Sequence, residues 1–248
     1  MTYCVGLVLK RGLVFMSDTR TNSGVDNIST FRKMFTWEVP GERSITLMTA
    51  GNLATTQAVV SLIEERSKEP GARSPSILEA ASMFQVATLV GNLLKEVIAR
   101  HAETGQKADA AFNATMILGG QVSDGEPRLF LIYPEGNFIE ASFDAPYFQI
   151  GETKYGRPIL VRAYDPEMSF EDAVKLLLVS FDSTIKANLS VSLPLDVHTY
   201  VADSLCTGRT FRIQSDDPYF EAVSSGWGIA LRDAFGQLPP FHFPAPED

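Results

Sequence analysis

Two apolar runs at the start of the chain constrain its fold more than any other feature. Residues 3–9 and 13–16 are almost entirely apolar, and the polar turn Lys10-Arg11-Gly12 joins them. In the first run, the residues at odd positions and those at even positions are both apolar or small, so neither face has a polar side. Strands of this kind lie inside a layered fold rather than on a sheet with one wet face. We therefore predict a hairpin that is covered on both sides.

The rest of the chain alternates between groups of strands and pairs of helices. Asn52 suits the N-cap of the first helix, and Ser169 with Asp172 fits a capping box before the fourth. Further strands are predicted over residues 33–39, 43–49, 111–120, 128–133, 137–141, 147–150, 197–203 and 210–213, and helices over 53–69, 77–101, 157–163 and 170–186.

This order of elements favours an α+β fold. Two double-sided sheets stacked face to face, with helices outside both, satisfy the order and the apolar strands. The prediction is a four-layer αββα sandwich. A parallel doubly wound fold would need regular alternation of strands and helices, which the sequence lacks. We expect one domain over residues 1–238 and a Pro-rich tail over 239–248, whose prolines keep it from being helical.

Composition excludes several classes of function. A net charge of −9 over 248 residues argues against a nucleic-acid surface, which needs a basic patch. No apolar run approaches the roughly 20 residues of a membrane span, and the N-terminal residues lack the pattern of a secretory signal. We expect a cytoplasmic protein without membrane or nucleic-acid partners. Cys4 and Cys206 are expected to be reduced core thiols rather than a disulfide.

Thr2 is the first candidate for chemistry because it directly follows the initiator methionine. If Met1 is removed, Thr2 carries a free α-amino group next to its hydroxyl. That arrangement puts a nucleophile and a base in one residue. An α-amino group titrates at about 7.7–8.0, close to the pH at which a general base works best.

Three further residues complete the candidate site. Asp18 ends the second apolar run and Lys33 opens a later strand, and we expect the two charges to lie within about 4 Å of each other. A lysine beside Thr2 would favour loss of the hydroxyl proton. Gly51 lies at a corner between strand and helix, where a backbone N–H is a common oxyanion donor. Taken singly, each residue has an ordinary structural interpretation, namely an ion pair or a turn glycine.

No metal or cofactor is expected. The three histidines lie in a polar helix end, a late strand and the Pro-rich tail, with no spacing typical of a metal site or of a serine–histidine triad. These residues are His101, His198 and His242.

The N-terminal residues resemble a known family. The runs Thr2-Tyr3-Cys4-Val5-Gly6-Leu7, Gly12 to Arg20, Arg32-Lys33-Met34 and Thr49-Ala50-Gly51 are similar to the proteasome β-subunit superfamily of N-terminal nucleophile hydrolases. Within it, the chain looks most like the bacterial ancestral-β-subunit (Anbu) group, relatives of the HslV peptidase. The run from Gly151 to Gly156 and the helix near Phe170 extend the resemblance over most of the chain.

The resemblance implies the αββα sandwich and assigns roles to individual residues. It implies that Thr2 is the nucleophile, that Asp18 and Lys33 are its charge partners, and that Gly51 is the oxyanion donor. It also implies that the substrate cleft is lined by Asn22, Thr49 and Leu53.

The chain departs from the family at three places. Proteasome subunits often carry threonine at the position of Asn22, and a serine just before the glycine that matches Gly151, where this chain has Ile150. They also carry an Arg-Asp-x-x-Ser-Gly-like run after the long helix. Here Asn188 and Ser190 would stand in for that run, which contains no carboxylate over residues 186–192.

We therefore expect a threonine peptidase or amidase that acts on peptides or proteins and assembles into a ring or open spiral. The apolar helix over 77–98 and the aromatic residues Phe241 and Phe243 are the expected contact surfaces. Two alternatives are a catalytically silent ring-forming subunit and a small-molecule amide hydrolase. The sequence does not indicate whether an ATPase is a partner.

Overall fold

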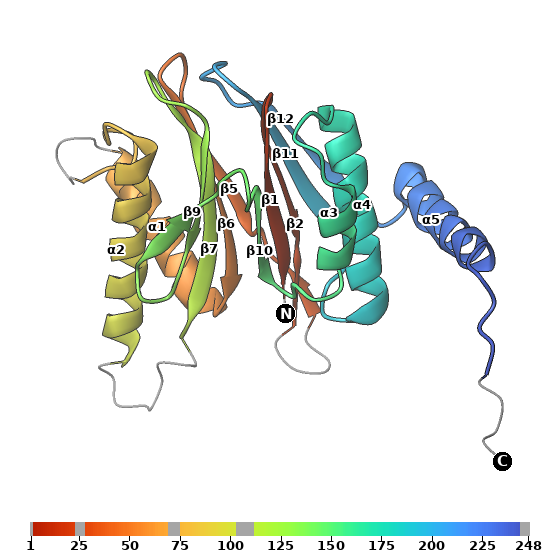
Figure 1. Cartoon of the computed structure of the whole chain (residues 1–248). Helices are drawn as coiled ribbons and strands as arrows, with labels where there is room; N and C mark the ends of the chain where they lie inside the picture. The colour runs from red at the N-terminus through yellow and green to blue at the C-terminus, as the bar shows by residue number, and fades with distance from the viewer. Residues whose placement is uncertain (1, 23–27, 69–74, 103–111, 244–248) are drawn as a thin grey trace.

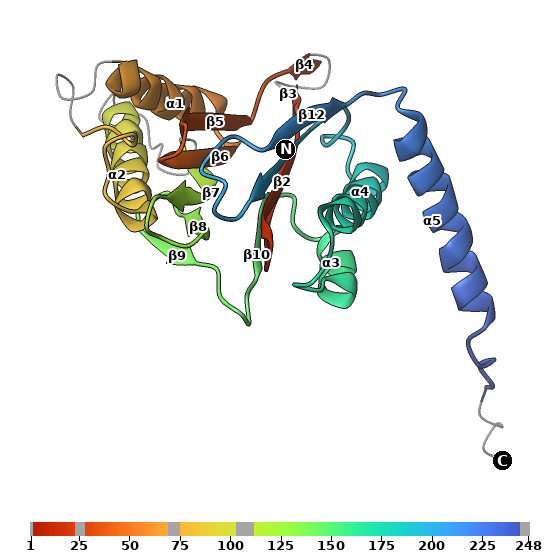
Figure 2. The ribbon, with the colours of Figure 1, turned by 90° about the horizontal axis from the view of Figure 1, so that it is seen from above.

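A computed structural model describes residues 2–22, 28–68, 75–102 and 112–243. Two antiparallel five-stranded sheets lie face to face, with α1 and α2 outside one sheet and α3 and α4 outside the other (Figures 1 and 2). The predicted four-layer αββα sandwich is confirmed. Among the helices in these ranges, none is long and apolar enough to cross a bilayer.

The strand order places the N-terminal hairpin inside the first sheet. That sheet consists, in spatial order, of β10 (Tyr147–Gly151), β1 (Tyr3–Leu9), β2 (Gly12–Asp18), β11 (Leu195–Val201) and β12 (Arg209–Ile213). The second sheet consists of β5 (Met34–Val39), β6 (Arg43–Gly51), β7 (Ala114–Val122), β8 (Arg128–Ile132) and β9 (Phe138–Glu140), and a separate pair is formed by β3 (Arg20–Asn22) and β4 (Ile28–Thr30).

The helices flank the sheets as the sequence predicts, with one addition. They are α1 (Leu53–Lys68), α2 (Met83–Ala102), α3 (Arg157–Ala163), α4 (Phe170–Ala187) and α5 (Pro218–Gly236).

Apolar side chains fill three spaces between the layers. Phe15 and Ile117 meet between the two sheets, Phe181 of α4 packs under the first sheet, and Leu94 of α2 packs under the second. Every residue of β2 is buried, as expected for a strand that is apolar on both faces. The double-sided hairpin is therefore confirmed.

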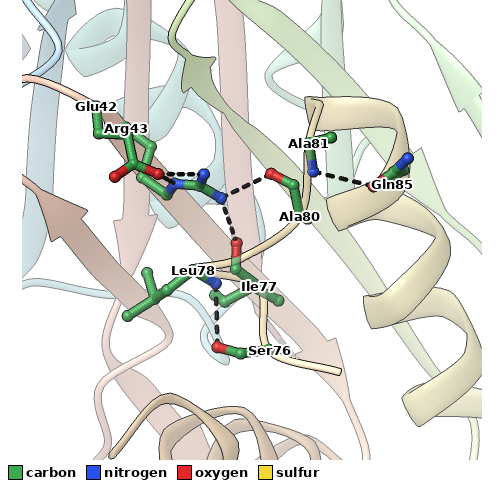
Figure 3. Close-up of polar contacts among 8 residues, drawn as sticks. All are labelled: Glu42, Arg43, Ser76, Ile77, Leu78, Ala80, Ala81 and Gln85. Carbon is green, nitrogen blue, oxygen red and sulfur yellow. Dashed lines mark hydrogen bonds and ion pairs between the residues drawn. The ribbon is translucent and has the colours of Figure 1, made fainter. Parts of the chain in front are cut away.

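Helix α2 begins at Met83. The sequence predicted a start at Ile77, six residues earlier. The buried guanidinium of Arg43 explains the difference. Its Nη1 donates to the carbonyl oxygens of Ile77 at 3.1 Å and Ala80 at 2.8 Å, while Glu42 binds the other side of the group (Figure 3). Carbonyls that bind a side chain from β6 are oriented by that contact, and the segment before α2 forms a turn instead of a helix.

The first turn of α2 is capped by neighbouring side chains. Ser82 Oγ accepts from the N–H of Gln85 at 3.3 Å. Gln85 Oε1 accepts from the N–H of Ala81 at 2.9 Å (Figure 3). These contacts satisfy N–H groups that the helix leaves without partners. They fix the start of α2 after Ser82.

The apolar stripe of α2 faces the interior. Val90, Leu94 and Val97 are buried in the cluster beneath the second sheet, as is Ile77 in the preceding turn. The apolar residues expected to contact other copies therefore pack in the core of the domain, and a contact through this helix stays a prediction.

Helix α5 was not predicted from the sequence. Asp217 caps it by accepting from the N–H groups of Tyr219 and Phe220, and Pro218 occupies the first turn. The helix leads away from the sandwich (Figures 1 and 2), and Phe220 is its buried residue. Because the rest of α5 has no buried stripe, its sequence lacks the clear periodicity that marks a packed helix.

Two smaller predictions also change. Strand β11 covers Leu195–Val201 and so begins and ends two residues earlier than predicted. Cys4 is a buried free thiol, as expected, whereas Cys206 is free but exposed and does not belong to the core.

His198 is a buried histidine that links the two sheets. Its Nδ1 lies 2.9 Å from Thr46 Oγ1 on β6, and its ring stacks on Phe15. Nε2 has no hydrogen-bond partner among the described residues. Burial lowers the pKa of His198 to about 4, because the charged ring would lose its hydration.

The depressed pKa of His198 predicts a loss of stability in acid. The unfolded chain binds the proton near pH 6.5, whereas the folded chain binds it only near pH 4. The stabilisation is complete above pH 6.5 and falls by roughly 3 kcal/mol as the pH drops to 4. Urea titrations across this range should show that wild type loses more stability than His198→Gln. Parallel curves for the two proteins would contradict the assignment.

Candidate active site

Asp18 and Lys33 form a buried ion pair at the ends of two strands. Asp18 ends β2 in the first sheet, and Lys33 directly precedes β5 in the second. Lys33 Nζ lies 2.8 Å from Asp18 Oδ1, and the two residues are 4% and 0% exposed. The predicted pairing is therefore confirmed, and it connects the two sheets at this edge.

The surroundings of Asp18 fix both charges. Asp18 Oδ1 also accepts from the N–H of Tyr3 at 3.0 Å, and Lys33 Nζ also donates to the carbonyl of Arg20. Burial raises the pKa of Asp18 above its ordinary value, and Lys33 and the Tyr3 N–H oppose that rise. Two of the three hydrogens of the ammonium are used by these acceptors, so Lys33 has a defined orientation.

Thr2, Lys33 and Gly51 line one cavity of about 310 Å³. A volume of this size matches small ligand sites. Thr49 and Leu53, which the sequence placed in the substrate cleft, line the same cavity, together with Thr21, Ala50, Thr56 and Gly151. The side chain of Asn22 lies outside the described residues. Its neighbour Thr21, which was not predicted for the site, reaches the cavity from β3.

Gly51 has a conformation that other residues rarely adopt. Its φ is +114°, and an added Cβ would lie 2.4 Å from the carbonyl oxygen of Asn113. The next residue, Asn52, accepts from the N–H of Thr55 at 3.0 Å and so caps α1 as predicted. The corner between β6 and α1 is therefore fixed tightly beside the cavity. The role of the Gly51 N–H as an oxyanion donor stays a prediction.

The end of β10 holds the main chain of Thr2. Glu152 N–H donates to the Thr2 carbonyl at 2.7 Å. Gly151, whose φ is +83°, comes so close that an added Cβ would lie 1.9 Å from the Thr2 oxygen. Ile150, at the position where the family usually has serine, is buried between the sheets.

Asn188 and Ser190 lie behind this contact rather than in the cavity. Asn188 follows α4, and its Nδ2 donates to Glu152 Oε2 at 2.9 Å. Ser190 N–H donates to Asn188 Oδ1 at 2.9 Å. The run over 186–192 has no carboxylate of its own, but Glu152 brings one to it from the end of β10. Glu152 was not among the residues predicted for the site, although it directly follows Gly151 in a run that carried the family resemblance.

Comparison with known proteins identifies the family. The family model described as proteasome subunit matches residues 2–193. The chain belongs to the proteasome family. It is 25% identical over 204 residues to a proteasome subunit beta of Haloquadratum walsbyi, which covers 82% of this chain and 75% of that protein.

Solved structures refine the placement within the proteasome family. The chain is 48% identical to Anbu from Yersinia bercovieri, with a TM-score of 0.90 over 98% of this chain and 100% of the other. It is 44% identical to a chain in the helical assembly of the Anbu complex from Pseudomonas aeruginosa, with a TM-score of 0.91 over 97% and 98%. The resemblance to the Anbu group is confirmed. Within the described residues, no group of three or more His, Cys, Asp or Glu side chains is placed to hold a metal ion.

The contact between Gly151 and Thr2 predicts that a single methyl group added at Gly151 lowers the free energy of unfolding measurably. Gly151→Ala meets both an unfavourable φ and a backbone clash, whereas Gly41→Ala meets a φ of +75° with no atom within 4 Å. Gly41→Ala should lose about 1–2 kcal/mol of unfolding free energy, and Gly151→Ala should lose clearly more. Denaturant titrations of both variants measure the difference. Equal losses would mean that the main chain at Thr2 moves away freely.

Proposed function

We propose that this chain is a threonine peptidase that cleaves peptide bonds with Thr2 after Met1 has been removed. The observation that carries the proposal is the single cavity shared by Thr2, the buried Lys33 and Gly51. Membership of the proteasome family supports a hydrolase of this class. The proposed location is the cytoplasm.

The proposed reaction begins at the hydroxyl of Thr2. The free α-amine takes the hydroxyl proton, directly or through a water, while Oγ attacks the carbonyl carbon of a peptide bond. The Gly51 N–H stabilises the negative oxygen of the tetrahedral intermediate. The proton then passes to the leaving amine, the C–N bond breaks, and an ester links the substrate to Thr2. Water activated by the same amine hydrolyses that ester.

Lys33 and Asp18 act on the nucleophile without touching the scissile bond. The ammonium of Lys33 raises the positive potential beside the Thr2 hydroxyl and favours loss of its proton. Asp18 holds Lys33 at 2.8 Å and compensates its charge in a site with little water. We propose that Thr49 and Leu53 contact a substrate side chain, and that Asn22 contacts the substrate from β3.

Replacing Thr2 separates an enzyme from a silent subunit. Wild type should lack Met1 by intact-mass analysis and hydrolyse at least one substrate in a broad panel of peptides and esters. Thr2→Ala should lose turnover completely and keep its melting temperature, because the change removes a hydroxyl and little packing volume. Thr2→Ser, which keeps a hydroxyl, is the matched control and should retain activity.

A boronate or epoxyketone provides a second measurement at Thr2. Mass spectrometry should find the electrophile on wild type and Thr2→Ser but not on Thr2→Ala. If processed wild type neither hydrolyses any member of the panel nor reacts with these electrophiles, the enzyme proposal fails. The chain would then be the catalytically silent member of an assembly.

The ion pair predicts a different pattern for Lys33. Lys33→Met should abolish turnover and cost roughly 3–5 kcal/mol of stability, because it leaves the Asp18 carboxylate buried without its partner. Adding Asp18→Asn should restore much of the stability but none of the activity. Chemical denaturation and peptide hydrolysis measure the two effects. Full activity in Lys33→Met would remove lysine from the mechanism.

We also propose that copies of the chain associate through α5 and the residues that follow it. Apolar side chains are exposed along this segment, and Phe235, Phe241 and Phe243 are each at least 77% exposed. Beside α5, a groove of about 450 Å³ is lined by apolar residues that include Phe170 and Phe211. The helical assembly of the similar Anbu chain from Pseudomonas aeruginosa supports a ring or open spiral.

Two aromatic residues provide the test of association. The double variant Phe241→Ser, Phe243→Ser should shift sedimentation profiles at micromolar concentration toward smaller species. Phe143→Ser is the control, because Phe143 is 92% exposed but lies far from α5 in the sequence. A wild type that sediments as a monomer would overturn the proposal. An unchanged profile for the double variant would exclude these two residues from the contact.

A further inference from the structure

The main chain fixes Glu152 directly beside Thr2. Strand pairing sets Tyr3 opposite Gly151, and the next hydrogen bond runs from the N–H of Glu152 to the Thr2 carbonyl at 2.7 Å. Because a nitrogen and an oxygen of one residue are at most about 3.6 Å apart, the Thr2 nitrogen lies within roughly 6 Å of the Glu152 nitrogen. The two residues cannot separate without breaking the end of the sheet.

Neutral donors hold the side chain of Glu152. Glu152 is 7% exposed. Asn188 Nδ2 donates to Oε2 at 2.9 Å, and the N–H of Lys154 donates to Oε1 at 3.3 Å. Each carboxylate oxygen accepts up to two hydrogen bonds, so these contacts leave acceptor capacity. They also keep the carboxylate from turning out into solvent.

Glu152 differs from the buried Asp18 and Asp182 because it has no cationic partner in the part of the chain that the structure describes. Asp18 pairs with Lys33, and Asp182 of α4 pairs with Lys186 at 2.9 Å. Those four charges cancel in pairs. A carboxylate that is largely removed from water ordinarily has a cation beside it.

Removal of Met1 would create such a cation. The nitrogen of Thr2 changes from a neutral peptide nitrogen into an ammonium when the peptide bond before it is cut. We infer that the Glu152 carboxylate pairs with the α-ammonium of Thr2 in the processed chain and thereby positions this amine as the base. The inference deepens the proposed function and rests on it for the role of the amine.

The pairing has a direct chemical consequence. An opposite charge within about 4–6 Å stabilises the protonated amine and raises its pKa. The neutral amine that accepts the Thr2 hydroxyl proton is then a stronger base, but it is available only at higher pH. Asn188 acts one step further away, because it holds the carboxylate that holds the amine. Glu152 is thus a positioning residue that supplies the carboxylate missing from residues 186–192.

The pKa of the Thr2 amine can be measured without turnover. The protein is made as a fusion whose processing protease leaves Thr2 as the first residue, and the rate of acetylation of the N-terminal peptide by acetic anhydride is followed against pH by mass spectrometry. Glu152→Gln keeps the shape and the hydrogen-bond acceptor but removes the charge. It should lower the pKa of the amine by about one unit or more.

Activity provides the matching readout. In Glu152→Gln the acidic limb of the kcat/KM profile should move to lower pH by the same amount as the amine. Glu152→Asp, which keeps the charge, should restore part of the wild-type position. Glu167→Gln is the matched control, because Glu167 is an exposed partner of Lys10, and it should shift neither curve. If Glu152→Gln does not fold, Asn188→Ala tests the same contact by releasing the carboxylate and should lower the amine pKa by less.

The outcomes separate the inference from the proposed function. An amine pKa that is the same in wild type, Glu152→Gln and Asn188→Ala overturns the pairing, whether or not the protein is active. A lowered amine pKa in a protein that hydrolyses no substrate would support the pairing while the peptidase proposal fails.

Discussion

The position of β1 between β10 and β2 is the constraint on which the candidate site depends. Antiparallel pairing on both sides fixes the main chain from Tyr3 onward, and the contact with Glu152 extends this order to Thr2. A residue near the start of a chain is ordinarily among the least ordered parts of a domain. Here the sheet holds Thr2 beside a cavity, which gives it the defined position that the proposed nucleophilic role requires.

The same corner holds two buried charges, those of Asp18 and Lys33. The Lys33–Asp18 pair joins the two sheets where β2 ends and β5 begins, and its members are fifteen residues apart in sequence. Removing two charges from water is costly unless the pair is well hydrogen-bonded. Backbone groups of Tyr3 and Arg20 supply extra bonds, while Asp18 Oδ2 has no hydrogen-bond partner among the described residues. Such an arrangement is weak evidence for stability and stronger evidence for a site where function sets the electrostatics.

The sequence predicts those parts of the molecule whose signals are local. The double-sided hairpin is visible in the alternation of residues 3–16, and the cap at Asn52 follows from its residue type. Asp18 and Lys33 could be paired before the fold was known because each charge stands at the end of a predicted strand, and the family resemblance carried both residues as well. That resemblance also directed attention to Thr49 and Leu53, which do line the cavity.

The predictions from the sequence are wrong or missing where a contact between distant residues determines the structure. The start of α2 depends on Arg43, which reaches Ile77 from another element. Glu152 meets Asn188 across 36 positions of sequence, so no spacing rule could reveal that a carboxylate reaches the run after α4. Helix α5 was not predicted for the opposite reason. It makes so few contacts with its own domain that its sequence has no buried stripe to detect.

Because α5 is isolated, its helical structure can be lost independently of the sandwich. A helix of 19 residues that buries one side chain draws most of its stability from its own sequence, whereas most helices in proteins depend on the packing of an apolar face. If other copies cover α5, mass action links its helicity to protein concentration. Dilution would then unwind α5 while both sheets stay intact, so that hydrogen exchange in residues 218–236 reports assembly and exchange in β1 reports folding.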